Sequence, residues 1–319
     1  AEARGVRFAP EQSTSGHSCK RALSGAVLAR VEPGDEVLLP RPAWVSYDEQ
    51  VRIAGGVPVG APPRADGGPD FDAIESALTA RTAGVMLNSP CNPSGYVWTT
   101  AEVEQLARIA AERDLWILSD EIYRRLVYDG EPWASPVGVG PATRARTVIL
   151  DGASKSFAMT GYRIGFAAAR PEVAAGIARL HSHLTGCPNA ISQAAYLAAL
   201  REEPREVAAW VAEYASRRDY ALDRLAKLGL RTPRPRGAYY LFPEVTRWLD
   251  ERGSAGFCED LLEARDLAIV PGSAFGQDDH VRLSYALSRD LLERALDRFE
   301  AFLAAHPKSP ANAAGRGGS

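Results

Sequence analysis

Lysine is the scarcest charged residue in this sequence. Only four of the 37 lysine and arginine residues are lysines, at positions 20, 155, 227 and 308. Because arginine fills almost every basic position, a lysine is expected where a guanidinium cannot do the chemistry. A primary amine can condense with an aldehyde, whereas a guanidinium, which stays protonated, essentially cannot. The surroundings of each lysine therefore become informative.

Other shortages exclude whole classes of protein. No apolar run is long enough and free enough of charge to predict a transmembrane helix, and the first residues contain no apolar segment of a secretory signal. The net charge is −3, the isoelectric point is near 6.0 and no basic tract occurs. We therefore expect neither nucleic acid nor an anionic membrane as a partner.

Cysteine is also sparse and dispersed. Its four positions, 19, 91, 187 and 258, show no paired spacing, which argues against a disulfide framework or a zinc site and predicts reduced thiols in a cytoplasmic protein. His181 and His183 form an H-x-H pattern, but on a helix these positions point to opposite sides. We predict no metal site.

Short apolar runs alternate with amphipathic segments over the first two thirds of the sequence. Expected strands are 36–40, 57–59, 84–88, 115–118, 148–150 and 164–168, and expected helices include 20–30, 71–80 and 100–112. The last of these helices follows a capping box, Thr99 to Glu102. Such alternation predicts an α/β fold, with a mostly parallel sheet covered by helices on both faces.

The pattern changes near residue 201. A long helix is expected over 205–228, followed by strands at 238–242, 268–270 and 281–284 that alternate with helices at 257–265 and 291–305. We predict four parts: a remnant of an N-terminal segment (1–15), a large ligand-binding domain (16–200), a smaller α/β domain (201–305) and a disordered tail (306–319).

Lys155 occupies the most unusual setting of the four lysines. It lies in the segment DGASKSFAMTGYR, directly after the apolar run Thr147–Leu150. This pattern predicts a strand that ends in a loop presenting an amine. Taken alone, Lys155 could equally be an ordinary surface lysine, so its neighbours at the other strand ends decide the interpretation.

Polar residues at the other predicted strand ends describe a ring-shaped ligand. In doubly wound sheets, ligands bind just beyond the carboxyl ends of the strands. Lys155 could hold an aldehyde as a Schiff base, and Asp120 could keep a pyridine nitrogen protonated. Tyr123 and Asn92 are suited to hydrogen-bond a phenolic oxygen beside that aldehyde. Taken singly, Asp120 could instead be a helix N-cap, and Tyr123 a packing residue.

A second group of residues suits a phosphate. Arg163 can bind a phosphate through two N–H groups, and Ser154 could add a hydroxyl. The polar run containing Ser18 and Cys19 is expected to open a helix, whose first N–H groups favour anions. Trp44 could stack on the ring, or could simply pack in the core. Together, the two groups imply pyridoxal 5′-phosphate (PLP) as the cofactor.

Four motifs in this sequence resemble those of the fold-type I, class I aminotransferases, especially the bacterial aspartate/aromatic/prephenate group. The segment NSPCNPSG at 88–95 resembles N-x-P-x-N-P-T-G, and SDEIY at 119–123 matches the family pattern. Ser154–Lys155 through Gly165 matches the Schiff-base segment, and HVRLSY at 280–285 resembles the strand whose arginine binds the substrate α-carboxylate. The resemblance covers about residues 16–305 and implies a PLP-dependent aminotransferase with a ping-pong mechanism.

The resemblance also assigns roles to particular residues and to a second subunit. It implies that Arg282, with Asn92, binds the substrate, and that Lys155, Asp120 and Tyr123 are catalytic. Family members form homodimers and carry an N-terminal segment that covers the active site, and this sequence is expected to begin after that segment. The loop 185–189 reaches the neighbouring subunit in relatives, so we predict a homodimer acting on an amino acid and a 2-oxo acid.

Two other readings remain open at this point. A β-lyase, a decarboxylase or a cyclopropane-carboxylate synthase of the same fold would use the same cofactor residues. A PLP-binding domain without catalytic activity, or a fragment of an enzyme, would also keep them. Contacts with the substrate, rather than with the cofactor, distinguish these possibilities.

Overall fold

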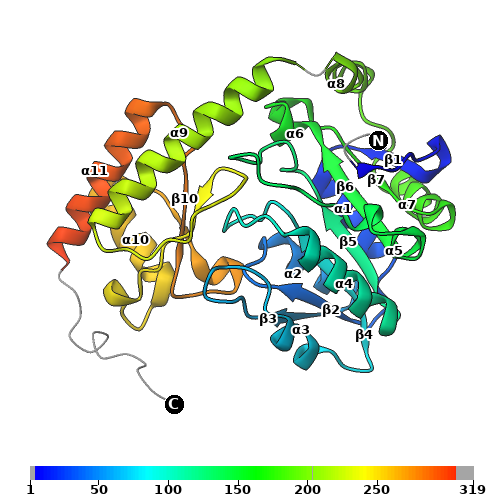
Figure 1. Ribbon diagram of the computed structural model, residues 1–319, viewed down its shortest axis with the longest axis horizontal. Helices are drawn as coiled ribbons and strands as arrows, with labels where there is room; N and C mark the ends of the chain where they lie inside the picture. Colours follow the sequence, from blue (N-terminus) through cyan, green and yellow to red (C-terminus); the bar gives the residue numbers. More distant parts are fainter. Residues whose placement is uncertain (1–3, 203, 307–319) are drawn as a thin grey trace.

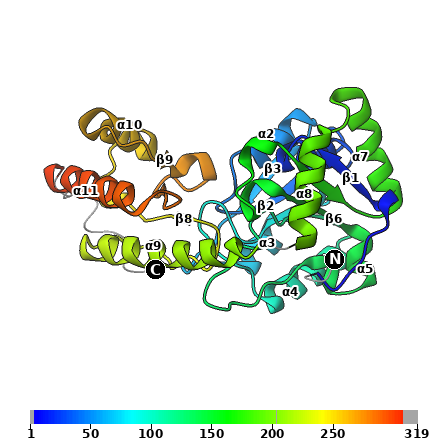
Figure 2. The same ribbon diagram turned by 90° about the horizontal axis from the view of Figure 1, so that it is seen from above.

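The computed structural model describes residues 4–202 and 204–306. The predicted disordered tail lies outside these residues, except for His306. Figures 1 and 2 show two parts side by side, a large one built on a twisted sheet and a smaller one that contains the long helix α9 (Glu206–Lys227). This is the α/β arrangement that the sequence predicts.

The central sheet of the large part has seven strands in the order β1-β7-β6-β5-β4-β2-β3. All neighbouring pairs from β3 to β6 are parallel, whereas β7 runs antiparallel to both β6 and β1. The strands are β1 (Ser13–Gly16), β2 (Glu36–Pro40), β3 (Val57–Ala61), β4 (Thr82–Asn88), β5 (Trp116–Asp120), β6 (Thr147–Gly152) and β7 (Gly165–Ala168).

Helices cover both faces of this sheet, which explains why its inner strands, such as β2 and β4, are mostly apolar. Successive residues of one strand enter different cores: Leu39 packs with α1 and α2, while Leu38 packs with α3 and α4. The helices of the large part are α1 (Cys19–Leu28), α2 (Ser46–Ile53), α3 (Phe71–Ala77), α4 (Thr100–Glu112), α5 (Pro141–Arg146), α6 (Ala153–Ser156), α7 (Pro171–Leu184) and α8 (Ala190–Glu202).

The smaller part has its own antiparallel sheet and core. Its strands are β8 (Tyr240–Leu241), β9 (Val270–Pro271) and β10 (Val281–Ser284), in the order β8-β10-β9. The helices are α9 (Glu206–Lys227), α10 (Gly253–Arg265) and α11 (Arg289–Ala305), and they pack with this sheet around Phe257, Tyr285 and Phe299.

Two local predictions change in the structure. The polar segment before α1 contains the edge strand β1, which the sequence analysis missed because Ser13–Gly16 has no apolar residue. Lys155 does not lie in a loop but on the one-turn helix α6, directly after β6. The predicted capping box is confirmed: the Thr99 hydroxyl accepts from the Glu102 N–H, and the Glu102 carboxylate accepts from the Thr99 N–H.

The first described residues pack beneath the carboxyl ends of β5 and β6. The buried guanidinium of Arg4 donates to Glu121 at 2.5 Å and to Asp151 at 2.8 Å, and Arg124 donates to the same Asp151 oxygen at 2.6 Å. This network fixes the segment before β1 against the strand ends that carry the polar residues.

Among the described helices, none is both long enough and apolar enough to cross a membrane.

Candidate active site

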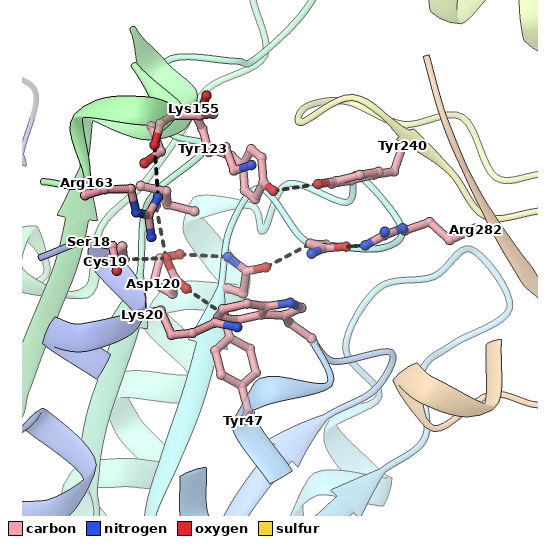
Figure 3. Close-up of a pocket in the computed structure, with 16 residues that line it drawn as sticks. Ser18, Cys19, Lys20, Tyr47, Asp120, Tyr123, Lys155, Arg163, Tyr240 and Arg282 are labelled. Carbon is pink, nitrogen blue, oxygen red and sulfur yellow. Dashed lines mark hydrogen bonds between the residues drawn. The ribbon is translucent and has the colours of Figure 1, made fainter. Parts of the chain in front are cut away.

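Every site residue predicted from the sequence lines one cavity. The cavity has a volume of about 330 Å³ and lies at the carboxyl edge of the central sheet, facing the smaller part (Figure 3). The predicted residues that it brings together are Ser18, Cys19, Trp44, Asn92, Asp120, Tyr123, Ser154, Lys155, Arg163 and Arg282. They come from six different segments, so the tertiary fold alone assembles them.

Asp120 ends β5 at the bottom of the cavity and is only 3% exposed. Its Oδ2 accepts a hydrogen bond from Tyr47 Oη at 2.8 Å, and its Oδ1 accepts from the backbone N–H of Ile122 at 3.2 Å. Burial raises the pKa of this carboxyl to about 6, and the hydrogen bonds from Tyr47 and Ile122 oppose that rise. The site therefore holds a buried carboxylate whose charge a cationic ligand would stabilise.

Tyr123 and Lys155 lie above Asp120 in Figure 3. Tyr123 Oη shares a hydrogen bond of 2.8 Å with Tyr240 Oη, and burial raises the pKa of Tyr123 well above its usual value. The ammonium of Lys155 lies 5.6 Å from the ring centroid of Tyr239. An amine and a neutral phenol thus border the same space.

The amino end of α1 lines one end of the cavity. Ser18 caps this helix by accepting from the N–H of Arg21, and Cys19 is its first residue. Gly165 on β7 permits the close packing of this turn, because a Cβ there would lie 2.5 Å from the backbone nitrogen of Cys19. Arg163 lies beside the helix end, and its Nη1 donates a hydrogen bond to the carbonyl of Thr160 at 3.0 Å.

Arg282 and Asn92 occupy the side of the cavity formed with the smaller part. Arg282 Nη1 donates to Asn92 Oδ1 at 2.8 Å, and its guanidinium lies over the ring of Tyr240, 4.5 Å from the centroid. The backbone N–H of Asn92 donates to Asn88 Oδ1 at 2.8 Å, and Asn88 Nδ2 donates to the carbonyl of Asp120 at 3.0 Å. A chain of amides thus connects Arg282 to the strand end that carries Asp120.

Two residues that are not predicted from the sequence, Tyr47 and Tyr240, contact predicted site residues. Tyr47, three residues after Trp44 in the first turn of α2, donates to Asp120. Tyr240 on β8 contacts both Tyr123 and Arg282. The spacing of Trp44 and Tyr47 could have predicted a shared helix face, whereas no sequence signal distinguishes Tyr240 from a core tyrosine. Lys20, which received no role, also lines the cavity.

The side chains present fit PLP. The buried carboxylate of Asp120 suits a protonated pyridine nitrogen, and the amine of Lys155 suits the aldehyde. A helix N-terminus with an adjacent arginine, Arg163, suits the phosphate. These groups line one cavity at the carboxyl ends of parallel strands, where such folds bind ligands. The fold and the site define a fold-type I PLP-dependent enzyme.

Comparison with known proteins identifies the family. The model of the family "Aminotransferase class I and II" matches residues 3–299. An aspartate/prephenate aminotransferase of Thermus thermophilus is 42% identical over 300 residues, which are 92% of this chain and 76% of the relative. An aspartate aminotransferase of Bacillus sp. (strain YM-2) is 36% identical over 304 residues, 93% of this chain and 78% of the relative.

Solved structures agree with the sequence comparison. An aspartate aminotransferase of Thermus thermophilus with maleate superposes with a TM-score of 0.88 at 40% identity, covering 95% of this chain and 78% of that one. An aspartate aminotransferase of Rhizobium meliloti gives a TM-score of 0.89 at 35% identity, covering 94% and 78%. The chain belongs to the class I and II aminotransferases: it is a PLP-dependent transferase that moves an amino group between an amino acid and a 2-oxo acid.

Proposed function

We propose specific roles for the residues that line the cavity. Lys155 binds the cofactor covalently, Asp120 pairs with its ring nitrogen, and Tyr123 and Asn92 hydrogen-bond its phenolic oxygen. Arg282 binds the substrate α-carboxylate. The residues assigned to the phosphate are Ser18, Cys19, Ser154 and Arg163, and Trp44 is assigned to the face of the ring. The single observation that supports these roles best is that all of these side chains line one cavity.

The proposed chemistry uses an amine that moves a proton and groups that hold the reactants still. When bound, PLP supplies an aldehyde that captures amines and a ring that withdraws electrons from the substrate Cα. Lys155 would hold the cofactor, and as a free amine its Nζ would accept the proton from the substrate Cα and then donate it, as an acid, to the carbon that had carried the aldehyde. Arg282 fixes the substrate carboxylate, so that the Cα–H bond stays in one orientation.

The proposed electrostatic role of Asp120 follows from its burial. A lone carboxylate in an apolar site is costly, and burial raises the pKa of Asp120 to about 6. A ring nitrogen that carries a proton would offset this cost and keep the carboxylate charged. Asp120 would thereby hold that proton on the ring throughout the reaction. Tyr47, which donates to Asp120 at 2.8 Å, orients the carboxylate.

We propose that acidic amino acids are the preferred donors. The relatives are named aspartate and aspartate/prephenate aminotransferases. Aspartate and prephenate share a second carboxylate, and neither contains an aromatic ring. Arg282 suits the α-carboxylate common to all amino acids and therefore does not select among them. Aspartate, glutamate and aromatic amino acids form the first panel to compare.

We further propose that the enzyme is a homodimer. Helix α8 is apolar around most of its circumference yet exposed, with Ile191 78% and Leu197 47% exposed. Such a face favours burial against a second copy of the chain. It directly follows the loop 185–189. Light scattering across a dilution series tests this proposal, and a monomer at micromolar concentration contradicts it.

We also propose that the enzyme is cytoplasmic and has the domain limits expected from the sequence. The four free cysteines are consistent with a reducing compartment.

An absorbance experiment tests the proposed chemistry. The purified chain is mixed with PLP, and spectra are recorded before and after each amino acid of the panel is added, with Lys155→Ala alongside. A cofactor band that requires Lys155, and that particular amino acids convert to the pyridoxamine form, supports the assignments and names the donor. A band that no amino acid changes would instead support cofactor binding without transamination. Failure of Lys155→Ala to alter the spectrum contradicts the role of Lys155.

A further inference from the structure

A second polar cavity lies at the opposite end of the same strands. It has a volume of about 230 Å³ and borders the first residues of β5 and β6, next to α5 and the start of α7 (Figure 1). It is therefore separated from the active site by the length of the sheet. The residues that line it are Arg30, Asp114, Leu115, Trp116, Ala142, Ala145, Arg146, Thr147, Val148, Ala169, Arg170 and Val173.

The charges around this cavity are unbalanced. Three guanidinium groups, from Arg30, Arg146 and Arg170, face one carboxylate, that of Asp114. Asp114 already pairs with Arg146 at 3.1 Å. Among the described residues, the ion-pair partner of Arg170 is the exposed Glu172, which lies outside the lining at 3.8 Å. The lining thus carries a formal charge of about +2.

Arg30 has the least compensated of these charges. Within residues 4–202 and 204–306, its side chain forms no hydrogen bond or ion pair. The guanidinium carbon of Arg30 lies over the indole of Trp116, 5.9 Å from the ring centroid. Burial and the nearby Arg170 lower the pKa of Arg30, and the carboxylate of Asp114 opposes this shift. Asp114 also pairs with Arg146, so it compensates the charges of Arg30 and Arg170 only in part. A further anion would stabilise Arg30 in this position.

One further donor borders the same cavity. Trp116 is only 3% exposed, and in the described part of the chain its Nε1–H has no hydrogen-bond acceptor. A buried donor without an acceptor is unfavourable. The 14-residue helix α7 begins beside Arg170, but its amino end adds few donors, because Pro171 has no N–H and the N–H of Val173 donates to the carbonyl of Arg170 at 3.1 Å.

We propose that this cavity binds a phosphate-type dianion, either inorganic phosphate or the phosphate group of a small metabolite. The guanidiniums of Arg30, Arg146 and Arg170 and the unpaired buried indole N–H of Trp116 supply the donors. A dianion matches the net charge of the lining, and the cavity volume of about 230 Å³ accommodates a phosphate group. This site is distinct from the cofactor's phosphate site, which lies at the amino end of α1.

Calorimetric titration of the PLP-loaded enzyme at low ionic strength tests the proposal. The bound cofactor fills the phosphate end of the active site, so any phosphate bound in addition occupies another place. Inorganic phosphate and glycerol 3-phosphate are titrated separately, because a preference between them distinguishes the free ion from a phosphate ester. We expect one site per chain, weakened at least ~10-fold in Arg30→Gln and in Arg170→Gln. Arg52→Gln, at an exposed position on α2, should leave it unchanged.

Three results would overturn the proposal. The first is that the loaded enzyme binds no additional phosphate. The second is that the wild type and both cavity variants bind phosphate equally. The third is that Arg52→Gln weakens phosphate binding as much as the cavity variants do. Equal binding in all variants would identify an adventitious ion only. If Arg30→Gln does not fold, the Arg170→Gln variant, at a half-exposed position, provides the test. The phosphate-dependent rise in melting temperature is then measured as well. That rise should be present in the wild type and smaller in Arg170→Gln.

Discussion

Asn92 and Arg282, 190 residues apart in the sequence, are joined by a hydrogen bond of 2.8 Å between Asn92 Oδ1 and Arg282 Nη1. Asn92 belongs to the turn after β4 in the large part, and Arg282 belongs to β10 in the smaller part. The bond therefore ties the proposed carboxylate-binding arginine to the sheet that carries the proposed cofactor residues. A shift of one part against the other would displace Arg282 from the cavity.

Replacing Asn92 with alanine should weaken substrate binding by releasing Arg282. Loss of one hydrogen bond to a charged group corresponds to about 1.5 kcal/mol, so we expect KM for the amino acid to rise roughly tenfold. Asn92→Asp should also raise KM, because its carboxylate would compete with the substrate for the guanidinium. Steady-state kinetics with aspartate measure both. Glu104→Ala, at an exposed position on α4, serves as the control, and an equal rise in that variant would contradict the prediction.

Replacing Asp120 with asparagine should stabilise the cofactor-free protein at high pH. Burial raises the pKa of Asp120 to about 6, so the folded chain holds a proton that the unfolded chain releases near pH 4. The stability from this group is present below about pH 4 and is lost as the pH rises through about 6. Asparagine cannot ionise, so the free energy of unfolding should rise by at most about 3 kcal/mol at pH 8 and stay unchanged at pH 4.

Urea unfolding of the cofactor-free protein at pH 4 and pH 8 measures this difference. Glu104→Gln, an exposed change on α4, is the control and should show no such difference. With PLP bound, the same Asp120→Asn variant should lose activity at least ~100-fold, because a neutral amide no longer keeps the ring nitrogen protonated. An asparagine variant that gains no stability at pH 8 would show that Asp120 is not a costly buried carboxylate.

Removing the hydroxyl of Tyr240 should alter the cofactor environment without emptying the pocket. Tyr240→Phe keeps the ring beneath Arg282 but leaves Tyr123 Oη without its partner at 2.8 Å. We expect a stability loss of about 1 kcal/mol and a shift in the pH midpoint of the bound cofactor's absorbance, with KM little changed. Tyr285→Phe removes a buried hydroxyl in the core of the smaller part. It should cost similar stability and leave the absorbance titration unaltered; a titration shift in both variants would contradict a specific role.

Adding one methyl group at Gly165 should disturb the phosphate end of the site. A Cβ there would lie 2.5 Å from Cys19 N and 2.8 Å from the carbonyl carbon of Ser18, both backbone atoms. We expect Gly165→Ala to cost about 1–3 kcal/mol in stability and to weaken PLP binding, measured by absorbance titration. Gly161→Ala meets no atom within 4 Å and is the matched control. Wild-type affinity in Gly165→Ala would show that the turn tolerates displacement.

The sequence predicts the layered core well and the polar edge strand poorly. Strand β2 was predicted with its observed limits, Glu36–Pro40, because a continuous apolar run is what a strand buried on both faces requires. Strand β1 was missed, because Ser13–Gly16 is stabilised by backbone pairing with β7 rather than by burial of apolar side chains. Backbone pairing leaves no signature in side-chain pattern.

Local motifs predict the chemistry available in this protein: an amine at Lys155, a carboxylate at Asp120 and arginines at 163 and 282, each next to a predicted strand or helix end. Those motifs are local, so their spacing can be read directly. The contact of Tyr240 with Tyr123 and the hydrogen bond from Arg282 to Asn92 arise only in the folded chain. Such contacts depend on how the two parts pack against each other, and packing between segments more than a hundred residues apart is not encoded in any one of them.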